Sequence, residues 1–87
     1  MLIYDEFIKL IEDKKFDQLD FTDIKIQNFF VYYLINKNND IDNSTIINKF
    51  NSIAKCEFKV SRSNISKIRK KLTDNCKGND IYELKRN

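Results

Sequence analysis

Apolar residues recur at helical spacing in four segments of the chain. Because residues three and four apart lie on one face of a helix, each segment predicts an amphipathic helix. The four predicted helices cover about residues 2–14, a segment that begins after Asp20 or Thr22 and runs to about Asn36, residues 44–55 and residues 62–72. The residues expected to face the core are Ile3, Phe7, Leu10, Ile11, Ile26, Phe29, Phe30, Tyr33, Leu34, Ile46, Ile47, Phe50, Ile53, Ala54, Ile65, Ile68 and Leu72. The aromatic second helix is expected at the centre of the core.

Polar residues mark the expected starts of three of these helices. A Ser, Thr, Asp or Asn side chain directly before a helix can accept a hydrogen bond from a backbone N–H of the first turn. Asp20 or Thr22 can cap the second helix, Asn43 or Ser44 the third, and Ser61 the fourth.

The segments between and after the helices are less regular. Residues 36–43, NKNNDIDN, predict a polar loop. Residues 56–60, CEFKV, alternate apolar and charged residues, which fits either a short strand or an extended turn. Residues 73–80 predict another loop, and residues 81–87 could pack on the core as a short helix or as a strand.

The composition supports a single all-α domain. The chain has 87 residues, no proline and one glycine, whereas an all-β fold would need more turn residues. We therefore expect residues 1–87 to form one small bundle of four to five helices.

The residue types present argue against an enzyme or a metal site. Histidine, the commonest general base and metal ligand, is absent. Cys56 and Cys76 have no third thiol to complete a zinc site, so both are expected to be free. The acidic residues of the first half are expected to cap helices or to face solvent. We therefore expect no catalytic residue, no cofactor and no metal.

The location of the protein follows from two further observations. No segment has the length and apolar character of a membrane span, and acidic residues occupy the N-terminus where a signal peptide would be basic. These observations predict a cytoplasmic protein, or a nuclear or viral one within a reducing compartment, with free thiols and no membrane partner.

Basic residues are concentrated in the second half of the chain. Residues 1–43 hold five Lys or Arg and nine Asp or Glu, whereas residues 44–87 hold eleven and four. Five of the sixteen basic residues fall in residues 60–72, VSRSNISKIRKKL, which contain no acidic residue. This segment is either a solvated helix face in a lysine-rich protein or a helix that binds nucleic acid.

The polar face of the fourth predicted helix fits duplex DNA. Small polar residues let a helix approach the bases, and cations reach phosphates or base edges. With the third helix and a short link, it has the layout of a helix-turn-helix, a motif that commonly dimerises to read two half-sites. The expected base contacts are Ser63, Asn64, Ser66 and Lys67, and the expected phosphate contacts are Arg62, Lys70, Lys71, Lys59 and the backbone N–H groups at Ser44 and Thr45.

The same segment resembles the recognition helix of the RpiR family of sugar-responsive transcription regulators. The matching residues are Val60, Ser61, Ser63, Ile65, Lys67, Lys70, Lys71 and Leu72. Upstream, FTDIKIQNFFVYYLINKN is similar to the family's Leu-Thr opening and following helix, and KGNDIYELK is similar to its closing segment. The resemblance implies a transcription regulator that binds duplex DNA, either as the isolated DNA-binding part or as a small stand-alone protein.

A second reading starts from the acidic first helix. With Asp5, Glu6, Glu12 and Asp13 exposed, this helix could bind a basic protein partner. The protein would then be a small interaction module of a phage or mobile element that inhibits a nucleic-acid-processing host complex.

Overall fold

Four α-helices and one 3₁₀ helix follow one another in the computed structural model, which describes residues 2–73. They are α1 (Tyr4–Glu12), the 3₁₀ helix η1 (Phe16–Gln18), α2 (Ile24–Lys37), α3 (Asn43–Ile53) and α4 (Arg62–Thr73). Residues 2–73 contain no strand, so the predicted all-α bundle is confirmed. The predictions for the loop and tail beyond Thr73, and for Cys76, lie outside the described residues.

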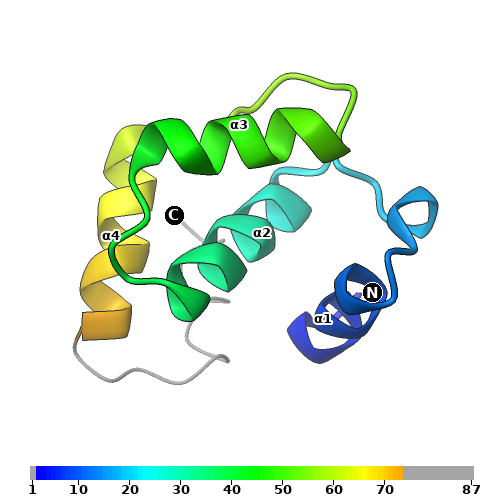
Figure 1. Cartoon of the computed structure of the whole chain (residues 1–87), viewed down its shortest axis with the longest axis horizontal. Helices are drawn as coiled ribbons and strands as arrows, with labels where there is room; N and C mark the ends of the chain where they lie inside the picture. The colour runs from blue at the N-terminus through cyan, green and yellow to red at the C-terminus, as the bar shows by residue number, and fades with distance from the viewer. Residues whose placement is uncertain (1, 74–87) are drawn as a thin grey trace.

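Helix α2 lies between α1 on one side and α3 and α4 on the other (Figure 1). Every residue from Ile26 to Tyr32 is buried, so α2 is covered on nearly all sides and not along one stripe only. Tyr33 and Leu34, predicted to be core residues, are only half-buried. The central position predicted for this helix is therefore confirmed, and its buried surface is wider than the apolar pattern indicated.

Aromatic side chains join the helices around α2. Phe7 of α1 packs on Phe29 with ring centroids 5.7 Å apart, and Phe50 of α3 packs edge-on against Phe30 at 5.8 Å. Such ring pairs add to the free energy gained by burying apolar surface. Ile3 is the exception among the predicted core residues of α1, because it precedes the helix and is 45% exposed.

The caps of α2 and α3 differ from the prediction. Asp23 accepts a hydrogen bond from the Lys25 backbone N–H at 2.9 Å, and Asp42 accepts one from Thr45 N–H at 2.7 Å. The predicted caps were wrong because several cap-competent residues precede each helix and any of them can accept this bond. At α4, Ser61 Oγ accepts from Asn64 N–H at 3.2 Å, which confirms the predicted cap.

The link between α3 and α4, residues 54–61, contains neither helix nor strand. Phe58 packs on Phe50 with ring centroids 5.1 Å apart, so the link lies against the second half of α3. Helix-turn-helix motifs usually have a turn of about three or four residues at this point. The link is eight residues long here, two more than between the predicted helices, and because it contains no strand the extended turn is favoured over the short strand for residues 56–60.

Candidate nucleic-acid interface

Two buried isoleucines fix which side of α4 faces outward. Ile65 and Ile68 are 1% and 0% exposed and belong to the same core as α2, as the helical spacing predicted. The opposite side is therefore turned to solvent. The exposed residues of this outer face are Arg62, Ser63, Ser66, Lys67 and Lys70.

Arg69 holds the second half of α4 against the start of α3. One guanidinium nitrogen donates to the Ile41 carbonyl at 2.6 Å and to Asn43 Oδ1 at 3.0 Å, and the other donates to the Asn39 carbonyl at 3.3 Å. Hydrogen bonds from a charged donor are stronger than neutral ones. This cation is therefore structural and does not belong to the outer face.

Gln27 of α2 attaches the link to the core. Its side chain is fully buried and donates to the Phe21 carbonyl at 2.8 Å and to the Glu57 carbonyl at 2.9 Å. Its Oε1 accepts from Lys59 N–H at 2.7 Å. Both N–H groups of this amide have acceptors, and its oxygen uses one of its two lone pairs. These partners explain how a buried polar residue is tolerated. The link is thus held in place directly before α4.

Asn28, the next residue of α2, holds the start of α4. Its Oδ1 accepts from Asn64 Nδ2 at 2.6 Å, while its Nδ2 donates to the Ile24 carbonyl at 3.0 Å. Asn64, predicted to contact bases, is therefore half-buried and tied to α2. Its position on the border between the buried and exposed sides of α4 explains this outcome.

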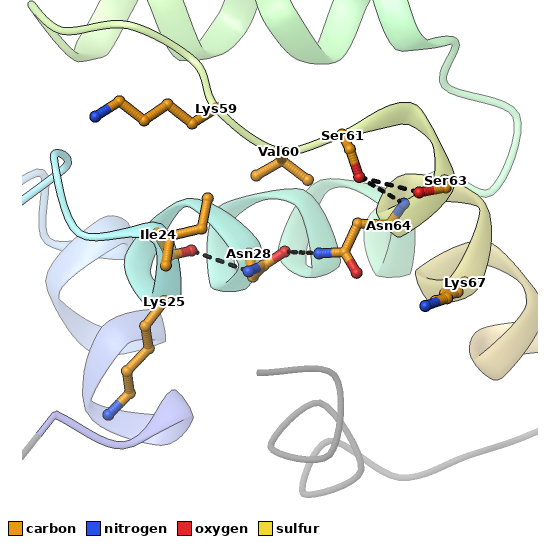
Figure 2. Close-up of a pocket in the computed structure, with 9 residues that line it drawn as sticks. All are labelled: Ile24, Lys25, Asn28, Lys59, Val60, Ser61, Ser63, Asn64 and Lys67. Atoms are coloured by element: carbon orange, nitrogen blue, oxygen red, sulfur yellow. Dashed lines mark hydrogen bonds between the residues drawn. The ribbon is translucent and has the colours of Figure 1, made fainter. Parts of the chain in front are cut away.

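A pocket of about 370 Å³, lined mostly by polar and charged residues, opens between the start of α2 and the start of α4 (Figure 2). The Asn28–Asn64 hydrogen bond crosses it, and Ser61 and Ser63 lie at the α4 side, 3.1 Å apart between hydroxyl oxygens. The pocket is lined by Ile24, Lys25, Asn28, Lys59, Val60, Ser61, Ser63, Asn64 and Lys67. It therefore brings together Lys59, Ser63, Asn64 and Lys67 of the predicted site and adds Lys25, which the sequence did not single out.

The remaining predicted site residues lie elsewhere. Lys71 is half-buried on the flank of α4. Ser44 and Thr45 are exposed in the first turn of α3, where the Asp42 carboxylate already accepts the Thr45 N–H. A phosphate would meet a negative charge at this helix start, so the predicted backbone contact at Thr45 is unfavourable.

A metal site and a membrane-spanning helix can both be assessed for residues 2–73. No group of three or more Cys, Asp or Glu side chains in this part of the chain is arranged to hold a metal ion. None of the helices described there is long and apolar enough to cross a membrane. The thiol of Cys56 is free and half-buried, as predicted.

Comparisons with models of known protein families, with curated proteins and with solved structures found no match to this chain. A functional assignment therefore depends on the residues and geometry described above.

Proposed function

We propose that this protein binds duplex DNA as a sequence-specific transcription regulator and that α4 is its recognition helix. The observation that carries the proposal is the outer face of α4, where three exposed cations alternate with two exposed serines and no acidic residue occurs between Arg62 and Thr73. Under this proposal α3 and α4 form a helix-turn-helix with a lengthened turn, related to that of the RpiR family.

The outer face divides into two roles. Ser63, Ser66 and Lys67 contact base edges, because short side chains let the helix approach and the ammonium reaches a guanine edge. Arg62 and Lys70 neutralise phosphates, with Lys71 and Lys59 at the flanks. Asn64 orients the helix through Asn28 instead of reading a base. A homodimer would read two half-sites about one helical turn apart.

Salt-dependent binding to duplex DNA tests the proposal. We expect the wild-type protein to bind a random 20-base-pair duplex, with an affinity that falls steeply as salt rises. Substituting Arg62, Lys67 and Lys70 by alanine should make the slope of log K against log salt shallower by roughly 1 per lost phosphate contact. Fluorescence anisotropy of a labelled duplex at four salt concentrations measures both quantities.

A charge-matched variant separates the site from net charge. Lys9, Lys14 and Lys15 lie at the end of α1 and in the turn after it, on the other side of α2 from α4 (Figure 1). Replacing these three by alanine removes the same charge and should leave most of the affinity and slope. Absence of duplex binding at low salt, or equal losses in the two triple variants, would refute the proposal.

A second candidate function is protein interaction through α1. Asp5, Glu6 and Glu12 are exposed on this helix, and Asp13 follows it, also exposed. Such a surface complements a basic partner, for example within a nucleic-acid-processing complex. Failure of the wild type to bind DNA would favour this function over the first.

A further inference from the structure

Cations from three separate segments surround the pocket between α2 and α4. Lys67 comes from α4, Lys59 from the link and Lys25 from the first turn of α2. The remaining residues of the lining are neutral, so none of the described residues there carries a negative charge. The pocket is therefore a local concentration of positive charge, in which Lys25 and Lys59 add to Lys67 of the outer face of α4.

The pocket is continuous with the outer face of α4. Ser63 and Lys67 belong to both, because they are exposed on α4 and also line the pocket. A helix with its side chains is about 10–12 Å across and the major groove is about 12 Å wide, so a helix in the groove has its flanks beside the sugar-phosphate chains. A duplex on α4 would thus have one backbone beside the mouth of this pocket.

The lysine side chains favour an extended ligand over a small anion. Lys25 and Lys59 extend away from the Asn28–Asn64 pair, whereas Lys67 lies on the opposite side of the pocket (Figure 2). The Lys25 ammonium lies 5.7 Å from the centre of the Phe29 ring, a contact that leaves the side chain partly exposed. Ammonium groups spread along a rim can neutralise successive phosphates, while a single bound anion would need them to converge.

We propose that the DNA-binding surface continues from α4 across this pocket to the start of α2, where Lys25 and Lys59 bind phosphates of the DNA backbone beside the groove. This inference rests on the proposed function and adds Lys25 as a binding residue on a different helix. Gln27 and Asn28 keep the two sides of the surface together, since they bond to the Lys59 backbone N–H and to Asn64.

The test compares two double variants by the salt dependence of duplex binding. Lys25→Ala with Lys59→Ala removes the rim cations but keeps the Lys59 backbone N–H that Gln27 accepts. We expect its slope of log K against log salt to be shallower than that of the wild type by about 2, at about 0.9 per phosphate contact. Lys14→Ala with Lys15→Ala loses the same charge and should keep the wild-type slope. Circular dichroism of each variant confirms that the helices are retained.

The outcomes distinguish this inference from the proposed function. If the α4 triple variant loses binding but the rim variant behaves like the Lys14 and Lys15 control, the inference is wrong and the proposed function stands. If the wild type binds no duplex, both are wrong. A pocket that serves free phosphate would show phosphate-induced NMR shifts at Lys25 and Lys59 with no change of DNA slope in the rim variant, which would also overturn the inference.

Discussion

Lys14 has a left-handed backbone, with φ of 57°, and follows Asp13, the C-cap of α1. The following N–H, of Lys15, donates to the Leu10 carbonyl at 2.9 Å and closes the end of the helix. Glycine is the usual residue at this position because its missing Cβ removes the steric cost of positive φ. The left-handed backbone of Lys14 explains why α1 ends at Glu12, whereas the apolar spacing predicted a helix that extends to Lys14.

We predict that Lys14→Gly stabilises the protein by about 0.5–1 kcal/mol, since the relieved strain exceeds the extra entropy of glycine in the unfolded chain. The free energy of unfolding from urea denaturation measures the change. Lys15→Gly is the matched control, because Lys15 has φ of −91° and gains nothing from glycine. A loss of stability in Lys14→Gly similar to that of the control would contradict this account of the turn.

Single polar residues are where sequence reasoning was least complete. Gln27 and Asn28 interrupt the apolar run of α2, and a polar pair inside such a run indicates internal hydrogen-bond partners. Three of their partners, Glu57, Lys59 and Asn64, are 30 to 36 residues away in sequence, so apolar periodicity could not identify them. Arg69 lies next to the apolar side of α4, a position that also indicates hydrogen bonds within the protein.

At the scale of elements, apolar spacing was sufficient to predict the four α-helices and the buried side of α4, but not the 3₁₀ helix η1. Ile65 and Ile68 alone determine this side, because burying both leaves little freedom of rotation about the helix axis. The pocket was not predictable, since it depends on how the start of α2 is placed beside α4. That placement depends on the hydrogen bonds of Gln27 with the link and of Asn28 with Asn64 of α4, together with the core that Ile65 and Ile68 share with α2.

We predict that Gln27→Leu destabilises the protein by roughly 2–3 kcal/mol, because it leaves the buried Phe21 carbonyl and two polar groups of the link without their partner. It should also reduce DNA affinity, since the link no longer fixes Lys59 and the start of α4. Urea denaturation and anisotropy measure the two effects.

Gln18→Leu is the control for that substitution, because Gln18 is exposed on η1 and its change should stay within about 0.5 kcal/mol. If the Gln27→Leu and Gln18→Leu proteins were equally stable, the Gln27 side chain would not be what holds the link in place. Unchanged DNA affinity in a destabilised but folded Gln27→Leu protein would show instead that the link is not needed for binding.

At the scale of the whole molecule, the Asp42 carboxylate caps α3 next to Ile41 and Asn43, the residues to which Arg69 of α4 is hydrogen-bonded. The hydrogen bonds with Thr45 lower the pKa of Asp42 below its ordinary value, and the positive charge of Arg69 lowers it further. Arg69 itself donates to the carbonyls of Asn39 and Ile41 and to Asn43 Oδ1, which carry no charge to lose in acid, so the pH dependence expected here belongs to the Asp42 carboxylate.

The sign of the resulting pH dependence follows from that pKa. A carboxyl whose folded pKa lies below its unfolded value of 3.8 stabilises the protein fully above that value, and loses this contribution as the pH falls through the folded pKa. We predict that Asp42→Asn, which still caps the helix but cannot ionise, shows a smaller loss of stability than the wild type between about pH 5 and pH 2. Urea denaturation midpoints at intervals across this range measure both curves, and the other carboxylates contribute equally to the two proteins. Parallel curves would mean that the Asp42 charge makes no net contribution to folding, and that the cap of α3 depends on the hydrogen bond with Thr45 N–H alone.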